Sequence, residues 1–402
     1  MPFDVEAIRA QFPGLDDPRD GKPFAYLDTA ATAQKPRVVI ERMAALLGLE
    51  YGTVHRGLYR RAAHTTKLYE DARTTAARFL NAERSEIVFT GGCTDAMNLV
   101  AQAWGRSQLK PGDRILVSGM EHHAGLVSWQ AAGFAPEPIP LCDDGSLDLD
   151  AYDRLLAGGG VKLVGCVHIS NALGTVNPVA ELARRAHAAG ALFLVDAAQS
   201  APHLALDVRA LDCDFLAFGG HKVYGPTGIG VLWGRRSVLE SMPPWRGGGE
   251  MIERVSFSGT TYAKPPARFE AGTPPITEAI ALATALEWLM ALDRGAACAH
   301  EDAMFAYAEA RLSTVPGLRR IGTAAQRTGV LSFTLPGAHP ADLASVLDME
   351  NVAIRAGHHC AQPVMERFSV PATARASIGI YTTKADIDRL HAGLQTCVRL
   401  FS

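Results

Sequence analysis

The sequence predicts an α/β fold with a mostly parallel sheet, followed by a smaller α+β region. From about residue 85 to 235, short apolar runs of strand length alternate with segments of helical periodicity, as in chains of β-α-β units. A region rich in glycine and proline, residues 243–275, interrupts this alternation. Together these observations predict a large domain over residues 20–290 and a small domain formed by residues 1–19 and 291–402.

Six apolar runs are the expected strands of the large sheet. They lie at residues 86–90, 114–119, 163–170, 192–198, 215–220 and 230–234. Between them, residues 179–189 repeat apolar side chains at helical spacing, which indicates an amphipathic helix. Because sheets of this kind bind ligands at the carboxyl ends of their strands, we expect functional residues in the loops that follow these runs.

The last third of the chain has a different order of elements. Residues 243–275 show little periodicity, and we expect them to form long functional loops. After them, the pattern predicts a helix over 277–292, a strand at 330–335, and helices over 341–349 and 384–399. This order is typical of a small α+β domain.

Composition and charge exclude several classes of protein. The 402 residues include 39 Lys+Arg and 42 Asp+Glu, so the net charge of −3 provides no electrostatic footprint for nucleic acid. No apolar stretch approaches the roughly 20 residues that cross a membrane. The first 15 residues lack the pattern of a signal peptide, and the seven cysteines form no close pairs that indicate disulfides or zinc. We therefore expect a cytoplasmic enzyme.

Two residues at neighbouring strand ends suggest a cofactor. Asp196 ends one predicted strand, and Lys222 follows the next strand along the chain. Pyridoxal phosphate needs a lysine for its Schiff base and a carboxylate that keeps the pyridine nitrogen protonated. Each residue alone has a simpler explanation, as a turn-forming aspartate or a solvated lysine. The pair favours a pyridoxal phosphate site.

Two further features agree with such a site. His122 follows the strand at 114–119, where it can stack on the cofactor ring and exchange protons, although a capping or core histidine is the simpler alternative. Residues 91–94, Gly-Gly-Cys-Thr, separate a strand from a helix expected to begin near Asp95. Backbone N–H groups at the start of such a helix can bind a phosphate.

Long sequence strings, in a fixed order, carry a family resemblance. They include YLDTAATAQKP (26–36), VHRG (54–57), MEHHAGLVSWQ (120–130), HISNALGT (168–175), LVDAAQ (194–199), GGHKVYGPTGIGVLWG (219–234), GGGEMI (247–252), RFEAGTP (268–274), RAGHHCAQP (355–363) and RASIGIYTT (375–383). Over nearly its full length the chain resembles the class V aminotransferase-like enzymes and, within them, the group II (Suf-type) cysteine desulfurases. The resemblance implies the fold type I of pyridoxal-phosphate-dependent transferases, with a mostly parallel sheet of the seven-stranded type and a smaller C-terminal α+β domain.

The resemblance also implies residue roles, first around the cofactor. Lys222 is the implied Schiff-base lysine, Asp196 the partner of the pyridine nitrogen, Gln199 the partner of the phenolic oxygen, and His122 the stacking residue and proton carrier. The implied phosphate ligands are Thr94 and His221, with Thr273 contributed by the neighbouring subunit of a homodimer. We expect Cys93 to be structural or a minor contact in the phosphate loop.

The remaining implied roles concern the substrate, L-cysteine. Asn171 and Arg375 would hold its carboxylate, Arg355 would line the entrance, and Cys360 would accept its sulfur. His358 and His359 flank Cys360 and Arg355 is nearby in the sequence, and this setting is expected to favour the reactive thiolate.

The other cysteines and a metal site are the alternatives to these roles. Five cysteines in apolar or helical segments are expected to be structural: Cys142, Cys166, Cys213, Cys298 and Cys397. Two adjacent histidines before a cysteine offer three metal ligands, but adjacent residues rarely close a tetrahedral site, so we expect no metal.

Two positions depart from the family pattern. Gly219 stands where the family often has serine, and Cys93 stands where it often has threonine. Each departure removes a hydroxyl from the implied phosphate site. We therefore expect the cofactor to be held somewhat less tightly, or through backbone and water.

The function implied by the resemblance is cysteine desulfuration. It yields L-alanine and a persulfide on Cys360, which passes to a SufE-like or SufU-like acceptor protein for iron–sulfur cluster assembly or another sulfur transfer. The alternatives are a selenocysteine lyase, another class V activity such as a transaminase or a kynureninase-like hydrolase, and a non-catalytic scaffold. The intact set of Lys222, Asp196, His122 and Cys360 argues against the scaffold.

Overall fold

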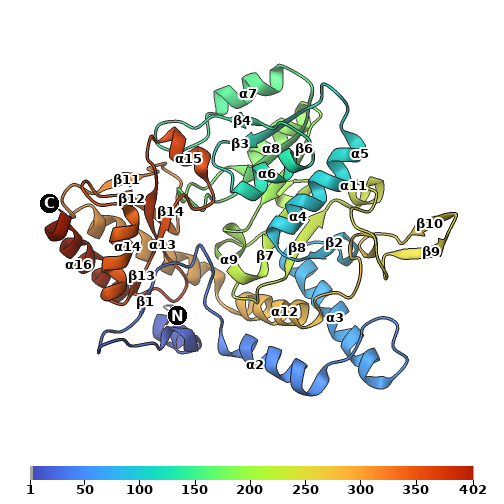
Figure 1. Cartoon of the computed structure of the whole chain (residues 1–402), viewed down its shortest axis with the longest axis horizontal. Helices are drawn as coiled ribbons and strands as arrows, with labels where there is room; N and C mark the ends of the chain where they lie inside the picture. Colours follow the sequence, from blue (N-terminus) through green and yellow to red (C-terminus); the bar gives the residue numbers. More distant parts are fainter. Residues whose placement is uncertain (1–2, 402) are drawn as a thin grey trace.

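A seven-stranded sheet forms the centre of the molecule (Figure 1). The computed structural model describes residues 3–401. The strand order is β2-β8-β7-β6-β5-β3-β4, and β8 runs antiparallel to both neighbours while the other pairs are parallel. The strands are β2 (Ile87–Thr90), β3 (Arg114–Ser118), β4 (Glu137–Ile139), β5 (Val161–Val167), β6 (Leu192–Asp196), β7 (Phe215–Gly219) and β8 (Gly230–Gly234). The predicted α/β fold with a mostly parallel sheet is confirmed.

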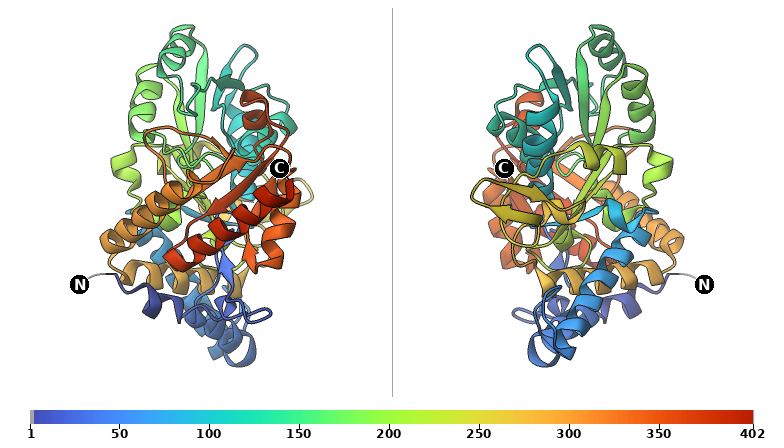
Figure 2. Two further views of the ribbon diagram at one scale, coloured as in Figure 1. Left: turned by 90° about the vertical axis from the view of Figure 1, so that its left-hand side faces the viewer. Right: turned by 90° about the vertical axis from the view of Figure 1, so that its right-hand side faces the viewer.

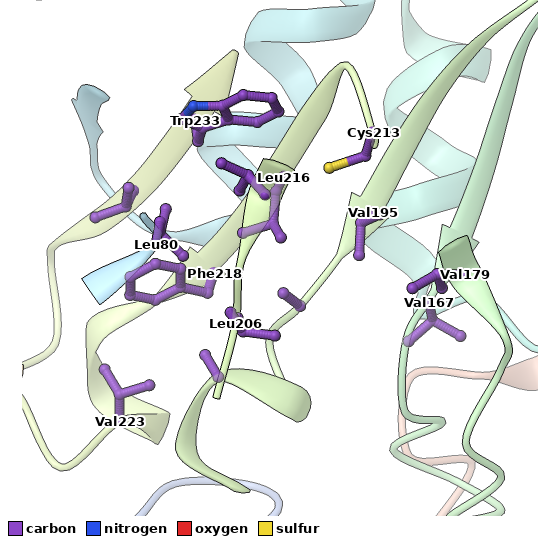
Figure 3. Packing of buried hydrophobic residues seen from close by; sticks show 14 of the residues in the cluster. Leu80, Val167, Val179, Val195, Leu206, Cys213, Leu216, Phe218, Val223 and Trp233 are labelled. Carbon is purple, nitrogen blue, oxygen red and sulfur yellow. The ribbon is translucent and has the colours of Figure 1, made fainter. Parts of the chain in front are cut away.

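Both faces of this sheet are buried, which explains the continuous apolar runs of its strands. On β7, Leu216 and Phe218 point into one core, whereas Phe215 and Ala217 point into the core on the opposite face. Figure 3 shows Leu216 and Phe218 packed beside side chains of the neighbouring strands. The first core is closed by α3 (Arg60–Phe79), α8 (Val179–Ala188) and α12 (Ile276–Ala291), and the second by α4 (Cys93–Leu99), α6 (His123–Ala131) and α11 (Arg236–Ser241).

The predicted helices of this region lie close to their expected bounds. The structure has α8 at Val179–Ala188 and α12 at Ile276–Ala291, each within one residue of the sequence prediction at both ends. The shorter helices connect the strands or flank the sheet: α2 (Arg37–Ala45), α5 (Arg106–Gln108), α7 (Leu149–Ala157), α9 (Ser200–His203) and α10 (Val208–Leu211).

A second, antiparallel sheet organises the C-terminal region. Its order is β11-β12-β15-β14, with bounds β11 (Arg319–Ile321), β12 (Val330–Thr334), β14 (Arg355–Gly357) and β15 (Thr373–Ser377). The helices of this region are α13 (Arg294–Leu312), α14 (Pro340–Met349), α15 (Gln362–Arg367) and α16 (Lys384–Phe401). The helices α13, α14 and α16 share a separate apolar core with this sheet, whereas the buried residues of α15 belong to a core of the large sheet. In the left view of Figure 2, α16 lies on the outside of this region. The predicted α+β region is confirmed.

The N-terminal segment contacts both regions. It begins with α1 (Val5–Arg9), and β1 (Ala25–Tyr26) then pairs in parallel with β13 (Val352–Ala353). Ala25 therefore packs in the C-terminal core. The domain boundaries after residues 19 and 290 stay a prediction.

Several elements lie outside the sequence prediction, among them β4 and a hairpin. The strand β4 is not one of the six predicted strands; its three residues include Pro138, and it lies at the edge of the sheet, where a proline is tolerated. Within residues 243–275 the chain also forms a hairpin of β9 (Ile252–Ser256) and β10 (Gly259–Tyr262), which projects from the body in Figure 1. Both strands are largely exposed, so burial imposes no apolar alternation on them. No helix within residues 3–401 is long and apolar enough to cross a membrane.

Candidate active site

A cavity of about 1040 Å³ opens at the carboxyl ends of β5, β6 and β7 and extends to the C-terminal sheet. Residues from loops more than 250 positions apart meet in its wall. All twelve residues singled out from the sequence line it: Cys93, Thr94, His122, Asn171, Asp196, Gln199, His221, Lys222, Thr273, Arg355, Cys360 and Arg375. The structure therefore brings the predicted site residues together, and their individual roles stay predictions.

Lys222 and Asp196 face the cavity because β6 and β7 are adjacent parallel strands. Asp196 is the last residue of β6 and is 3% exposed, and Lys222 lies in a single 3-10 turn directly after β7. Burial lowers the pKa of the Lys222 amine, while the Asp196 carboxylate opposes that shift. A larger fraction of the Lys222 side chain is therefore the neutral amine than for a lysine in water.

His122 caps α6 and also lines the cavity. Its Nδ1 accepts a hydrogen bond from the Ala124 backbone N–H at 3.1 Å. Burial lowers the pKa of His122 to about 4, so the ring is neutral at pH 7. Since Nδ1 is the acceptor, the ring proton is on Nε2. The capping role and the predicted role at the cofactor are compatible.

The start of α4 offers unsatisfied donors to an anion. Within residues 3–401 the backbone N–H groups of Cys93, Thr94 and Asp95 have no acceptor. Gly92, in the loop before them, has φ 151°, a conformation that favours glycine. On the neighbouring strand β8, a Cβ on Gly230 would lie 2.6 Å from the Gly92 backbone, so only glycine fits there. A phosphate at the mouth of this turn would satisfy donors that the protein leaves free.

Gln199 and His221 are both oriented by hydrogen bonds. The Gln199 side chain, 3% exposed, donates from Nε2 to the Ala30 carbonyl oxygen at 2.7 Å. The His221 Nδ1 lies 3.2 Å from the Thr32 hydroxyl, and burial together with Lys222 lowers the pKa of His221 to about 4. His221 is therefore a neutral hydrogen-bonding group rather than a cation.

Cys93 lies beside the carboxylate of Asp196. Its Sγ is 3.6 Å from Asp196 Oδ1, in a contact typical of a thiol that donates to an acid. Burial raises the pKa of the Cys93 thiol, and the neighbouring Asp196 charge raises it further. The thiol stays protonated, which supports the expectation that Cys93 is a minor contact rather than a nucleophile.

The opposite end of the cavity is cationic. The Arg375 side chain, among the most deeply buried of the large ones, donates to the Asn171 carbonyl oxygen at 2.9 Å and to Asp28 Oδ1 at 3.1 Å. Its Nε has no partner within residues 3–401. Arg355 sits directly opposite Arg375 in the register of β14 and β15. Two guanidinium groups on neighbouring strands suit the binding of a carboxylate.

Cys360 is half-buried in a loop between β14 and α15. The Arg375 guanidinium lies close enough to interact electrostatically with it. The expectation that His359 favours the thiolate is wrong: the ring turns away and its Nε2 lies 2.8 Å from the Thr373 hydroxyl. Burial lowers the pKa of His359 to about 3, so the ring carries no charge at pH 7. The fixed positive charge near Cys360 belongs to Arg375.

The other cysteines follow the prediction with one exception. Cys166, Cys213 and Cys397 are buried, and Cys298 is half-buried. Cys142 is exposed, so its expected structural role is wrong. It follows Leu141 at the start of a tight turn through Gly145, and this turn places the thiol at the surface.

Comparison with known proteins agrees with this geometry. The aminotransferase class-V family model matches residues 25–390. The chain belongs to the class V aminotransferase family. Within this family it is 48% identical, over 99% of its length and 98% of the relative, to a cysteine desulfurase of Dickeya dadantii (strain 3937). It is 47% identical to a cysteine desulfurase of Pectobacterium carotovorum subsp. carotovorum (strain PC1), over 100% of this chain and 99% of the relative.

A solved structure in the family has the same fold. The crystal structure of the cysteine desulfurase CsdA (S-sulfonic acid) from Escherichia coli superposes with a TM-score of 0.92 and 40% sequence identity, covering 100% of both chains. The fold predicted from the resemblance, and the resemblance itself, are confirmed.

Three residues that lie at or next to the cavity of this chain were not identified from the sequence. Asp28 holds the Arg375 guanidinium, and the motif that contains it was recognised without a role for its carboxylate. The Glu121 carboxyl is buried behind the cavity and accepts from the Val167 backbone N–H at 2.6 Å; burial raises its pKa to about 8. His123 contacts the Cys360 loop. Each acts through another residue, so sequence spacing gave no signal for it.

Proposed function

We infer that the chain is a cysteine desulfurase that depends on pyridoxal phosphate and converts L-cysteine into L-alanine with transfer of the sulfur. The observation that carries this inference is the meeting of Lys222, Asp196 and Cys360 in one cavity with two arginines at its far end. Full-length relatives at 47–48% identity are cysteine desulfurases, in agreement with the function predicted from the sequence.

The residues present fit the cofactor. Lys222 would hold it covalently, Asp196 would face its pyridine nitrogen, and Gln199 its phenolic oxygen. The free N–H groups at the start of α4, with the Thr94 hydroxyl and neutral His221, would bind its phosphate. When bound, pyridoxal phosphate supplies an electron sink that stabilises negative charge at the α-carbon of an amino acid.

The arginine end of the cavity orients the substrate. Arg375 has a donor without a protein partner and would bind the carboxylate of L-cysteine, with Arg355 across the strand pair adding positive charge. The Asn171 amide donates from Nδ2 to the His359 carbonyl at 2.5 Å, so one amide hydrogen is committed to the loop and the other is available to the substrate. This arrangement fixes which end of the substrate faces Cys360.

Two neutral groups at the cofactor end can move protons. The Lys222 amine, with its lowered pKa, is suited to accept the proton from the substrate α-carbon. The neutral His122 ring carries its proton on Nε2 and can donate it. Both groups respond to the Asp196 charge, so the carboxylate also tunes proton transfer.

In the transfer of sulfur, Cys360 is the nucleophile. The Cys360 thiolate attacks the substrate sulfur, an S–S bond forms, and the C–S bond breaks with its electron pair left on carbon. Protonation of that carbon gives alanine, and Arg375 places a positive charge near Cys360. The persulfide on Cys360 then passes to another thiol by exchange.

We further propose a protein thiol as the sulfur acceptor and a homodimer as the active form. The half-buried position of Cys360 supports access by an acceptor of the SufE or SufU kind. The dimer is supported by large apolar side chains left exposed on two segments, among them Leu49, Leu58, Val255 and Phe257. Thr273 of the same chain lines the cavity, and its contribution to the partner's site is part of the dimer proposal.

The test compares two cysteine variants on two substrates. Cys360→Ala should abolish alanine formation from L-cysteine but retain it from selenocysteine, because selenide leaves readily without a protein thiol. Cys142→Ala, which removes an exposed thiol, should behave as the parent with both substrates. Cysteine turnover at the parent rate in Cys360→Ala would overturn the proposed mechanism, and no turnover of L-cysteine by the parent would overturn the function.

A further inference from the structure

The loop that carries Cys360 has a backbone that side chains disfavour. His359 has φ 53° and Cys360 has φ 54°, so two successive residues with a Cβ adopt the left-handed conformation. Such a conformation persists only when contacts around it hold it. We call residues 358–362 the cysteine loop and consider what holds it.

The first half of the cysteine loop is held by hydrogen bonds between His359 and two other residues, Asn171 and Thr373. The Asn171 side chain donates to the His359 carbonyl oxygen at 2.5 Å, and His359 Nε2 lies 2.8 Å from the Thr373 hydroxyl and 3.1 Å from its carbonyl oxygen. All these contacts are made by His359. They leave the backbone of Cys360 and the residues after it without an anchor.

The other half is fixed by one residue, His123. Its backbone N–H donates to the Cys360 carbonyl oxygen at 2.6 Å, and its Nε2 accepts from the Gln362 backbone N–H at 3.1 Å. Within residues 3–401 the other backbone bonds of this half, such as Ala361 N–H to the His358 oxygen, stay inside the loop or its helix. His123 therefore forms hydrogen bonds with the backbone of Cys360 and with the backbone two residues after it.

His123 also fixes the loop relative to the cofactor end of the cavity. It is the first residue of α6, and the preceding residue, His122, caps this helix and lines the cavity. A single turn of backbone thus sets the position of the His122 ring and of the Cys360 thiol. Burial and the neighbouring His358 lower the pKa of His123, so the ring stays neutral at pH 7 and keeps Nε2 free to accept.

We infer that His123 is a positioning residue for sulfur transfer, whose ring holds the cysteine loop with the thiol directed at the substrate. The inference rests on the proposed role of Cys360. It assigns to this second histidine a hydrogen-bond acceptor function and no proton transfer. The Gln362 backbone N–H needs a hydrogen-bond acceptor at the position of His123 Nε2. The side-chain oxygen of a glutamine at this site can also supply one.

The experiment compares His123→Leu, which removes the acceptor, with His123→Gln, which keeps one. In the full-length holoenzyme, His123→Leu should slow persulfide formation from L-cysteine in a single turnover several-fold, while the cofactor absorbance is unchanged. It should also raise the rate at which iodoacetamide alkylates Cys360, measured against Cys142 in the same sample, because the loop opens more often. His123→Gln should match the parent in both measurements.

A histidine on the C-terminal helix provides the control. His391 lies on α16, and its Nε2 lies 2.9 Å from the Thr314 hydroxyl, outside the cavity and the loop. His391→Gln should leave persulfide formation and alkylation unchanged. Should His123→Leu be poorly folded, hydrogen–deuterium exchange of the Gln362 amide decides the matter, since His123→Gln keeps this amide as protected as in the parent.

Three results would overturn the inference: parent-like alkylation and persulfide formation in His123→Leu, an equal loss in the Leu and Gln variants, or a Gln362 amide that exchanges faster in His123→Gln. An equal loss would show that the imidazole itself is required. The alkylation and exchange measurements need no turnover, so they test the loop contact even if the parent forms no persulfide and the proposed function fails.

Discussion

Asp28 and Arg375 form a partly buried ion pair at 3.1 Å, between a segment near the N-terminus and the C-terminal sheet. Burial raises the pKa of the Asp28 carboxyl, and the Arg375 charge opposes that shift. A second guanidinium donor is held by the Asn171 carbonyl. These two contacts fix the plane of the guanidinium, and its Nε is a buried donor with no partner within residues 3–401.

Arg375→Lys should raise the KM for L-cysteine with the cofactor still bound. A lysine amine is a point charge and does not span Asp28, the Asn171 carbonyl and a substrate together. Loss of one charge-assisted hydrogen bond weakens binding by about 1.5–3 kcal/mol, or about tenfold to a hundredfold. Steady-state kinetics checks this, with Arg19→Lys at an exposed ion pair as the control. An unchanged KM would remove Arg375 from the substrate site.

Lys222→Ala should abolish the yellow colour of the covalently bound cofactor together with all turnover. The reason is that Lys222 is the amine placed between Asp196 and the arginine end of the cavity. Borohydride reduction of the parent followed by peptide mapping should label Lys222. The half-buried Lys35, whose pKa burial lowers to about 8, is the rival amine. A label on Lys35, or a variant that keeps reducible cofactor, means that the assignment is wrong.

Gly219→Ser should tighten cofactor binding. A Cβ at Gly219 would lie 3.4 Å from the His221 ring and 3.6 Å from the Cys93 backbone nitrogen, both ordinary contacts, so a side chain fits beside the free donors of α4. One added hydrogen bond is worth about 0.5–1.5 kcal/mol, or about two- to tenfold in the dissociation constant. Gly219→Ala, with the Cβ and no hydroxyl, is the control. Equal cofactor release from the two variants would show that the hydroxyl does not reach the phosphate.

Stability should fall as the pH drops below about 6.5, partly because of His168. Burial lowers its pKa to about 4, so below pH 6.5 the unfolded chain binds a proton that the folded chain excludes. Between pH 7 and pH 5 this residue should cost about 2 kcal/mol of unfolding free energy. His168→Gln should reduce the pH dependence of urea unfolding by that amount. An identical dependence in variant and parent would mean that His168 is not held neutral.

The strands of the large sheet were predictable because burial on both faces of the sheet requires a continuous run of apolar residues in each strand. Leu216 and Phe218 face one core and Phe215 and Ala217 the other, so the run is apolar throughout. The edge strand with Pro138 and the exposed β9–β10 hairpin carry no such signature. Their positions depend on neighbours that sequence periodicity does not encode.

The candidate site was predictable where chemistry follows a strand end, as for Asp196 and Lys222. It was not predictable where a residue acts through tertiary contacts. His359 looked like a cation beside Cys360, but its ring is buried against Thr373 and neutral. The charge near the thiol comes instead from Arg375, which the register of β15 brings beside the loop.

The central claim is that Cys360 takes the sulfur from L-cysteine. The most direct measurement incubates the holoenzyme with L-cysteine and maps reducible sulfur additions on its peptides by mass spectrometry. We predict one added sulfur on the peptide that contains Cys360, and none there in Cys360→Ala, which should still bind cofactor and substrate but form no alanine. A sulfur addition on Cys93 or Cys142 in place of Cys360, or alanine formed at the parent rate by Cys360→Ala, would contradict the account.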